Sequence, residues 1–170
     1  GVETIDVFHL HGVSPQSYDS VIAEVVPALL REKEKGKFRH LGITEVPPSD
    51  PYHDTLQRAV HEDCFDVLMV AFHMLHQSAR EKIFKFSLKN GIGTLIMFAV
   101  RYIFSQPGRV KEVVEGLASK GVLPSVLGQK NDPLDFLLHE DGAKNVIDAA
   151  YRYCRHEPGT DVTLFGTGSR

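Results

Sequence analysis

The stretch Phe65–His73, which reads FDVLMVAFH, is an almost unbroken apolar run that ends in a histidine. Its length is typical of one β-strand, and apolar residues at consecutive positions are typical of a strand that is covered on both faces. Strands of this kind belong mainly to parallel sheets, in which a helix connects each strand to the next. The run therefore predicts a parallel β/α fold.

Four other apolar runs occur along the chain, separated by helix-like segments: Ile5–His11, Phe38–Glu45, Gly93–Arg101 and Asp161–Ser169. Parallel strands bring their C-terminal ends to one edge of the sheet, and β/α folds bind their ligands at that edge. The function is therefore expected there. The residues that the sequence places at this edge are His11, Thr44, Glu45, His73, Arg101 and the turn Gly166–Ser169.

Apolar residues at helical spacing predict helices between the strands. A first helix from Tyr18 is expected to stop before Pro27, which suits the first turn of a second helix. Asp50 or Ser49 is expected to cap the helix that follows the second strand. The predicted helices after the first are Ala28–Lys35, Tyr52–Asp63, Ser78–Asn90, Arg109–Lys120 and Ala143–Arg155, with a short one near Pro133–Leu138.

Length and composition indicate one soluble domain. The chain has 170 residues, of which 42% are hydrophobic and 24% charged, with a formal net charge of −3. The chain has no excess of basic residues that would indicate nucleic-acid binding. No apolar run is long enough to cross a membrane. The start lacks a signal-peptide pattern, and Cys64 and Cys154 form no close-spaced motif. We therefore expect reduced thiols and a cytoplasmic protein.

The length also limits the architecture. A closed (β/α)₈ barrel needs about 250 residues, so five strands in 170 residues do not close one. An open parallel sheet is one solution. The other is that the chain is part of a larger protein, and a strand that begins almost at residue 1 favours this solution.

His11 follows a strand and precedes Gly12, so its ring can project over the edge that carries the function. A neutral imidazole there can donate a hydrogen bond to a carbonyl oxygen and orient it. A histidine that caps the local backbone would occupy the same position.

His9 lies two residues before His11, on the same face of the strand. Together with His73 or Glu45 from neighbouring strand ends, the two histidines could bind zinc, although two ligands alone do not make a site. The alternative is that His9 points into the core and His11 alone is exposed.

The turn Gly166–Ser169, which reads GTGS, follows the last strand. Glycines let backbone N–H groups approach an anion, so the turn could hold a phosphate, although an ordinary strand-to-helix turn has the same pattern. Arg80 and Arg101 are further candidate partners for an anion.

Five segments together resemble the aldo/keto reductase superfamily in order and spacing over almost the whole chain: Ile5–His11, Gly36–Thr44, Phe65–His73, Asn90–Gly93 and Leu164–Gly168. The resemblance implies a (β/α)₈ barrel that binds NADP(H) and reduces aldehydes and ketones. On this match residues 1–170 form a single partial barrel domain, an incomplete α/β TIM barrel of about five parallel strands. The domain runs from the fourth barrel strand to the eighth.

The resemblance also implies roles for individual residues. His11 corresponds to the histidine that orients the substrate carbonyl. Thr44 and Glu45 replace a Ser-Asn pair that contacts the nicotinamide, and Met97, with Phe98 beside it, replaces the aromatic residue that stacks on it. The cofactor phosphates would lie near Gly166, Thr167, Gly168 and Ser169. The family's catalytic tyrosine, lysine and aspartate lie on earlier strands and have no counterpart here.

Several positions depart from the family's pattern. An ionised Glu45 cannot donate a hydrogen bond as an amide does. Met69 stands where a glutamine is expected, Met97 has no aromatic ring, and His73 replaces an asparagine. These changes leave the expected fold unaffected and weaken the expected nicotinamide contacts.

The sequence therefore predicts the C-terminal part of an NADP(H)-dependent aldo/keto reductase. Its partner would be a small-molecule carbonyl substrate, and the isolated chain would be inactive because it lacks the general acid. No metal site is assigned. Two other functions stay open. One is a metal-dependent hydrolase that uses His9, His11 and His73, and the other is a non-catalytic relative that serves as a binding module.

Overall fold

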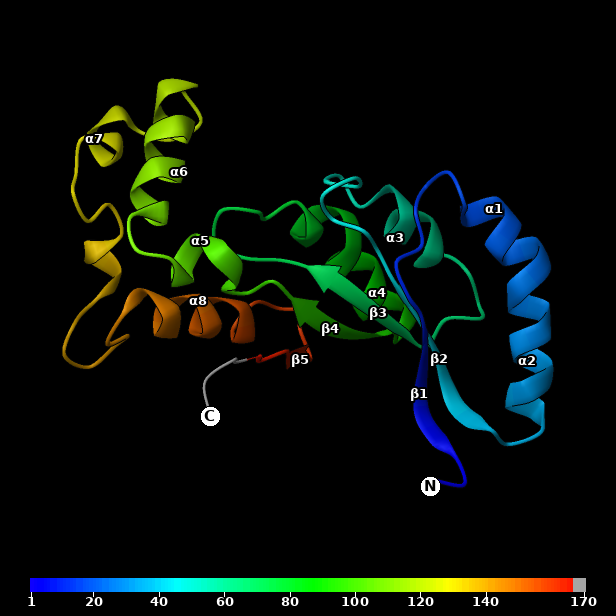
Figure 1. Cartoon of the computed structure of the whole chain (residues 1–170). Coiled ribbons are helices and arrows are strands. Elements are labelled where there is room, and N and C mark those ends of the chain that lie inside the picture. The colour runs from blue at the N-terminus through cyan, green and yellow to red at the C-terminus, as the bar shows by residue number, and fades with distance from the viewer. Residues whose placement is uncertain (167–170) are drawn as a thin grey trace.

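The computed structural model describes residues 1–166, which form a five-stranded sheet with all strands parallel (Figure 1). The strands lie across the sheet in chain order: β1 (Ile5–Leu10), β2 (Phe38–Thr44), β3 (Val67–Ala71), β4 (Gly93–Met97) and β5 (Val162–Thr163). Crossovers between parallel strands are right-handed, so a sheet in chain order places every connection on the same side. The predicted parallel fold is confirmed, with the winding of a barrel segment.

One face of the sheet forms the core. Leu41 and Ile43 on β2, Leu68 and Val70 on β3, and Ile96 on β4 have no exposed surface. They alternate with residues of the opposite face, as the two-residue period of a strand requires. Full burial of such a side chain stabilises the fold by about 1.5–3 kcal/mol, so this layer is a major source of stability.

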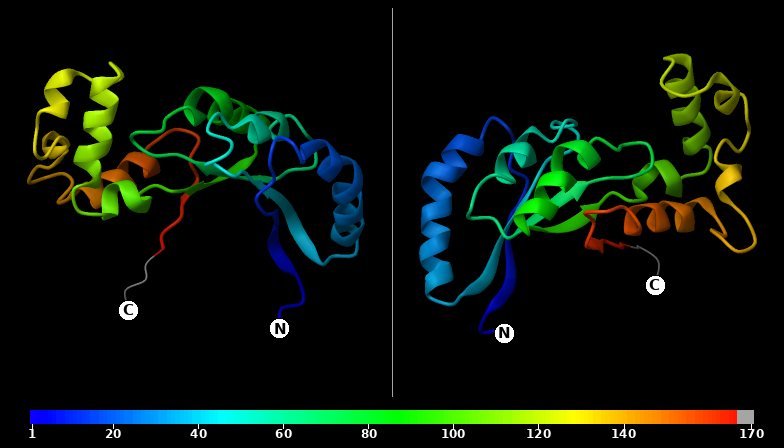
Figure 2. Two further views of the ribbon diagram at one scale, coloured as in Figure 1. Left: turned by 45° about the horizontal axis from the view of Figure 1, so that its top comes forward. Right: turned by 180° about the vertical axis from the view of Figure 1, so that it is seen from behind.

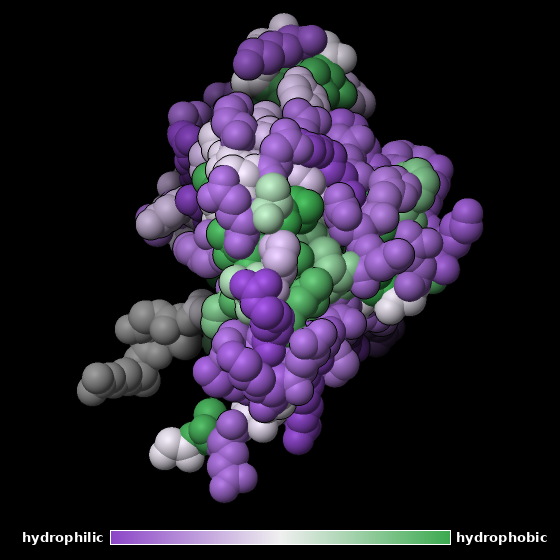
Figure 3. Space-filling view, turned by 90° about the vertical axis from the view of Figure 1, so that its right-hand side faces the viewer, coloured by the Kyte–Doolittle hydropathy of each residue, from purple (hydrophilic) through white to green (hydrophobic). Residues whose placement is uncertain are grey.

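The opposite face of the sheet is only half buried. It carries His9, Met69, Leu95 and Met97, each of which keeps some exposed surface. The apolar run 65–73 predicts a strand that is covered on both faces. Within residues 1–166, only the face toward the helices is fully covered. Seen from the side, apolar side chains form a strip between polar regions of the surface (Figure 3).

A continuous helical stretch follows β1. It consists of α1 (Tyr18–Ser20), the π-helix η1 (Val21–Val25) and α2 (Val26–Glu34). The predicted break before Pro27 is therefore wrong, whereas the predicted position of Pro27 in the first turn of the second helix is confirmed. The Val26 N–H donates to the Val21 carbonyl, which is the wide π-type spacing. This turn rearranges the hydrogen bonds just before Pro27, which has no N–H of its own, and the helix continues.

The next helix, α3 (Asp54–Ala59), is shorter than the predicted Tyr52–Asp63. The Asp50 carboxylate accepts hydrogen bonds from the N–H groups of Asp54 at 2.7 Å and Thr55 at 2.9 Å. Asp50 therefore satisfies the first turn, as predicted, but that turn begins at residue 54.

The helix predicted over residues 78–90 consists of the π-helix η2 (Arg80–Phe84) and α4 (Lys85–Asn90). Gly91 ends it with φ of 67°, a left-handed conformation that glycine adopts without a steric penalty. Within residues 1–166, no helix is long and apolar enough to cross a membrane.

The C-terminal part differs most from expectation. In the run Gly93–Arg101 the predicted strand Gly93–Val100 ends at Met97. In the run Asp161–Ser169 the predicted strand Asp161–Phe165 is reduced to two residues. Helices α6 (Arg109–Ser119) and α7 (Ser125–Gly128) form a lobe away from the strands (Figure 2). The helical elements here are α5 (Arg101–Ser105), α6 (Arg109–Ser119), α7 (Ser125–Gly128), the 3₁₀ turn η3 (Asp135–Leu137) and α8 (Val146–Arg155).

Candidate active site

His11 lies directly after β1 at the C-terminal edge of the sheet, and its side chain is exposed. Thr44, the last residue of β2, lies beside it. The Gly12 N–H donates to Thr44 Oγ1 at 2.6 Å, and the Val13 N–H donates to the Thr44 carbonyl oxygen at 3.0 Å. These two bonds hold the loop that carries His11 against the end of β2.

His9 lies on the half-buried face, over Gly42 of the neighbouring strand. A Cβ atom at Gly42 would come within 2.4 Å of the His9 ring, so the glycine makes room for the imidazole. Burial lowers the pKa of His9, and neither ring nitrogen has a hydrogen-bond partner within residues 1–166. Of the two histidines, His9 therefore points inward and His11 is exposed.

The zinc site suggested for His9, His11 and His73 has no ligand set in the described part of the chain. Within residues 1–166, no three side chains of the ligating types come together around a possible metal position.

Glu45 points away from the side that Thr44 faces, because consecutive strand residues alternate between faces. Its side chain has no exposed surface. Its carboxylate accepts the Ala71 N–H at 2.8 Å and lies 2.9 Å from His53 Nδ1 through each oxygen. Burial raises the pKa of Glu45, although the bonds from His53 and Ala71 act in the opposite direction. The cofactor contact expected of Glu45 therefore has no accessible oxygen in this structure.

His53 and Ser78 complete this network, and sequence reasoning missed both. His53 Nε2 lies 2.9 Å from Ser78 Oγ, and the His53 side chain is fully enclosed. The available signal was Glu45 itself, because a carboxylate directly after a buried strand needs a partner. That signal does not say where along the chain the partner lies.

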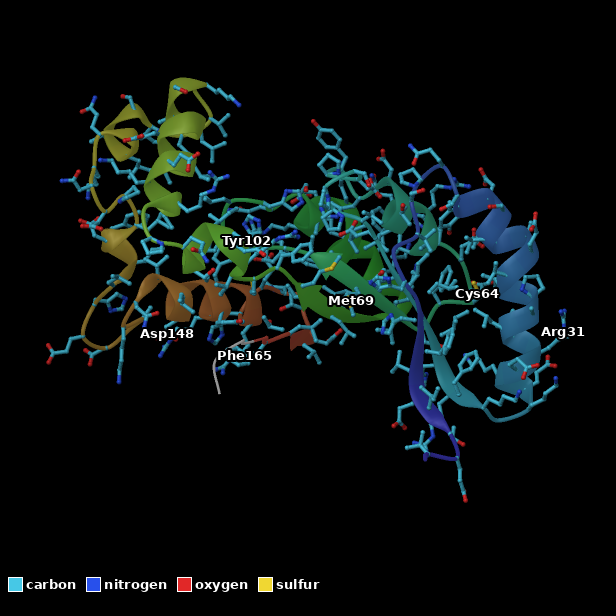
Figure 4. The ribbon with its side chains drawn as sticks, in the orientation of Figure 1. Arg31, Cys64, Met69, Tyr102, Asp148 and Phe165 are labelled. Carbon is cyan, nitrogen blue, oxygen red and sulfur yellow. The ribbon has the colours of Figure 1, made fainter. Side chains whose placement is uncertain are left out.

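Met97, Phe98 and Arg101 follow the end of β4. Phe98 has φ of 68° and Arg101 has φ of 37°, conformations that are uncommon for residues other than glycine. The Arg101 guanidinium lies 3.9 Å from the centre of the Phe98 ring. Met69 on β3 and Tyr102 on α5 can be followed in Figure 4. Unfavourable backbone conformations cluster at functional sites, which marks this turn as part of the candidate site.

A pocket of about 340 Å³ opens at the same edge, which is within the size range of small-molecule sites. A cavity of about 420 Å³ lies at the opposite end, around the starts of β3 and β4. Because β/α barrels act at the C-terminal ends of their strands, the smaller pocket is the candidate. It is lined by Pro47, Pro48, Pro51, Ala71, His73, Leu75, His76, Phe98, Arg101 and Ile103.

The end of the chain is only partly described. Gly166 follows β5 and is exposed, whereas Thr167, Gly168 and Ser169 lie outside the described residues. The Thr94 N–H donates to Asp161 Oδ2 at 2.8 Å, which aligns the short β5 with β4.

The model of the aldo/keto reductase family matches residues 1–169. The chain belongs to this family. The resemblance read from the sequence is thereby confirmed, together with a fold that forms an incomplete barrel. The family assignment also leaves the metal-dependent hydrolase without support from the described residues.

Individual relatives match shorter parts of this aldo/keto reductase chain. A 46-residue segment is 37% identical to L-galactose dehydrogenase of Arabidopsis thaliana and covers 27% of this chain and 14% of that protein. A 95-residue segment is 30% identical to D-threo-aldose 1-dehydrogenase of a Pseudomonas species and covers 55% of this chain and 27% of that protein.

The structure of a glycerol dehydrogenase from Gluconobacter oxydans shares the fold, with a TM-score of 0.59 and 16% identity. The match covers 98% of this chain and 50% of that one. The aldo/keto reductase chain thus spans half the length of this structure and less of the curated relatives.

The stability of the chain is expected to fall on acidification because of His73. Burial, followed by the neighbouring His76, lowers the pKa of His73 to about 4 from an ordinary 6.5. The Leu75 N–H also donates to His73 Nδ1 at 3.2 Å, which requires that nitrogen to be unprotonated. Between pH 6.5 and 4 the unfolded chain therefore binds more protons than the native one. The contribution of His73 to the free energy of unfolding is complete above pH 6.5. It falls by at most about 3 kcal/mol as the pH is lowered to 4.

Urea unfolding at several pH values measures this effect. A His73→Gln variant keeps an acceptor for the Leu75 N–H but cannot titrate, so its stability should depend less on pH than that of the wild type. The matched control is His156→Gln, at an exposed histidine after α8. Equal acid sensitivity of the wild type and His73→Gln would contradict the prediction.

Proposed function

We propose that this chain is the C-terminal part of an NADP(H)-dependent aldo/keto reductase that reduces an aldehyde or ketone in the complete protein. The observation that carries the proposal is the position of His11, which is exposed at the C-terminal edge beside Thr44 in a chain of this family. The 340 Å³ pocket opens at the same edge.

The residues present fit a nicotinamide in part. Thr44 Oγ1 accepts the Gly12 N–H and keeps its own proton for a carboxamide oxygen. Glu45 is enclosed and Met69 has no amide, so we assign the carboxamide contact to Thr44 alone. Met97 and Phe98 would border the ring. The phosphates would lie toward Gly166, Thr167, Gly168 and Ser169.

His11 is proposed to act on the substrate carbonyl. Its imidazole would donate a hydrogen bond to the carbonyl oxygen and hold the carbonyl carbon in the orientation needed for reduction. NADP(H), when bound, supplies the hydride. The proton for the resulting alkoxide would come from a tyrosine that the resemblance places on an earlier strand.

We propose that earlier strands of the same protein complete the barrel. Within residues 1–166, β1 and β5 each pair with one neighbour, so each has an unpaired edge. Unpaired edges favour association with other chains, and further strands would cover them together with the half-buried face. The twofold length of the glycerol dehydrogenase structure supports this proposal. The unpaired cysteines Cys64 and Cys154 support a cytoplasmic location.

The test compares the 170-residue chain with the product of its gene extended upstream of Gly1. NADPH oxidation by a reactive aldehyde is measured with each protein. We expect turnover by the longer protein and none by the isolated chain. In the longer protein, His11→Ala should lower kcat about 10²–10⁴-fold. His61→Ala, an exposed histidine at the opposite end of the sheet, should leave it unchanged.

Two results would contradict the proposal. Turnover by the isolated chain would show that the missing general acid is not required. Failure of the longer protein to bind NADPH in a fluorescence titration would favour a non-catalytic module. The departures at Glu45, Met69 and Met97 are the observations that favour that second function.

A further inference from the structure

A hydrogen-bonded chain of three side chains lies behind the candidate active site and consists of Ser78, His53 and Glu45. Ser78 Oγ is 2.9 Å from His53 Nε2, and His53 Nδ1 is 2.9 Å from both Glu45 oxygens. Glu45 and His53 have no exposed side-chain surface, whereas Ser78 is partly exposed. The hydroxyl of a partly exposed serine, a buried imidazole and a buried carboxylate in this order form the arrangement of a serine nucleophile with its general base.

The hydrogen bonds fix the direction in which a proton can move. The Glu45 carboxylate accepts from the Ala71 N–H, and when ionised it can only accept from His53 as well. His53 therefore carries its proton on Nδ1, and the lone pair of Nε2 faces Ser78. The Ser78 hydroxyl then donates to Nε2, which is the atom that must take its proton during nucleophilic attack.

The backbone around these three side chains supports the same assignment. His53 has φ of 62°, an uncommon conformation for a residue with a side chain. Two hydrogen bonds from the first turn of α3 to the Asp50 carboxylate hold the turn that contains it. Unfavourable conformations that the surrounding structure maintains occur preferentially at functional sites.

A backbone donor follows the hydroxyl. Within residues 1–166, the N–H of Ala79, the residue after Ser78, donates to no backbone carbonyl outside the regular helices and strands. In serine hydrolases the N–H of the residue after the nucleophile is one donor to the oxyanion that forms during acyl transfer. Ser78 is not among the residues that line the 340 Å³ pocket, so its chemistry is separate from the proposed reduction.

We propose that Ser78, with His53 as general base and Glu45 as its partner, forms a second catalytic site that hydrolyses small carboxylic esters. Ser78 Oγ bonds to the acyl carbon while its proton passes to His53 Nε2. The bond from that carbon to the alcohol oxygen then breaks, and the alcohol leaves with the proton from His53. A water oxygen then bonds to the acyl carbon while a water proton passes to His53 Nε2. The bond from that carbon to Ser78 Oγ breaks, the carboxylic acid leaves, and His53 returns the proton to Ser78 Oγ.

A fluorophosphonate probe tests this site in the 170-residue chain. The probe phosphonylates an activated serine, and mass spectrometry of the digested protein identifies the modified residue. We expect one adduct, on Ser78, and no adduct in Ser78→Ala. His53→Gln and Glu45→Gln should each slow labelling about 10²–10⁴-fold. The matched control Ser125→Ala, at an exposed serine that begins α7, should label at the wild-type rate.

Hydrolysis of p-nitrophenyl acetate is measured in the same variants, and circular dichroism checks that each is folded. Faster hydrolysis by the wild type and Ser125→Ala than by Ser78→Ala supports the proposal. If a variant is unfolded, the site of the adduct in the folded wild type decides. A folded wild type that stays unmodified at Ser78, or equal hydrolysis by Ser78→Ala and Ser125→Ala, would overturn the proposal and leave the three residues as a structural brace. Neither measurement uses NADPH, so failure here is distinguishable from failure of the proposed reduction.

Discussion

Replacing Glu45 with alanine is expected to lower the free energy of unfolding by about 3–5 kcal/mol. The substitution removes the acceptor of the Ala71 N–H and the partner of His53 Nδ1, in a space with no access to solvent. Each buried polar group left without a partner costs about 1–3 kcal/mol, and the space vacated by the side chain adds to the loss. Urea unfolding at neutral pH, followed by circular dichroism, measures the difference.

Two further variants identify the cause of that loss. Glu45→Gln keeps an oxygen acceptor and should lose less stability, about 1–3 kcal/mol. Glu81→Ala is the matched control, because Glu81 is exposed and, within residues 1–166, forms its one ion pair with Lys85 one helical turn away. Its effect should stay within about 0.5 kcal/mol. A loss for Glu45→Ala as small as that for Glu81→Ala would show that the carboxylate is not enclosed.

The strands before residue 98 could be predicted from the sequence because their apolar runs are short and bounded by turn residues. The run Phe38–Glu45 differs from β2 by one residue, and Ile5–His11 differs from β1 by one. In both cases the last residue of the run is the polar one that carries or supports the site. The rule that parallel strands end at one edge then places His11 and Thr44 together without any coordinates.

The orientation of single side chains could not be predicted, because it depends on the register between strands. His9 and His11 are two residues apart and so lie on the same face of a strand. The sequence leaves open which of them is exposed. The register that places His9 opposite Gly42 decides it, since only a residue without a side chain leaves space for the ring.

The network behind the site could not be predicted for a related reason. Glu45, His53 and Ser78 come from three separate segments, and no local motif links the last two across 25 positions. The sequence pattern predicts a helix over Tyr52–Asp63 and therefore places His53 inside it. The Asp50 cap instead starts the helix at Asp54 and leaves His53 in a left-handed turn. In that turn His53 Nδ1 lies 2.9 Å from the Glu45 carboxylate.

The segment after β4 shows how tertiary structure overrides a local pattern. Residues Gly93–Val100 read as one apolar strand, but the chain leaves the sheet at Phe98 through a left-handed residue and enters α5. Nothing in an apolar run marks such a turn when no glycine is present. The candidate site contains this turn, which agrees with the expectation that local rules fail first at functional positions.

Replacing Gly159 with alanine is expected to cost about 2–5 kcal/mol of stability, by two separate effects. Gly159 has φ of 90°, so a side chain is strained there by about 1–2 kcal/mol. A Cβ atom would also lie 2.6 Å from the Cβ of Phe84, a fully packed residue of η2. Overpacking of this kind costs about 1–3 kcal/mol. The backbone cannot easily move away, because the Gly159 carbonyl accepts the Thr94 hydroxyl at 2.7 Å.

Gly91→Ala separates the two effects. Gly91 has φ of 67°, but a Cβ atom there would meet nothing within 4 Å. Only the backbone strain should remain, about 1–2 kcal/mol, so the difference between the two variants measures the contact between residue 159 and Phe84. Denaturant unfolding of both variants and the wild type gives that difference. Equal losses of stability at the two positions would contradict the prediction. They would show that Gly159, in the turn before β5, does not pack closely against Phe84 of η2.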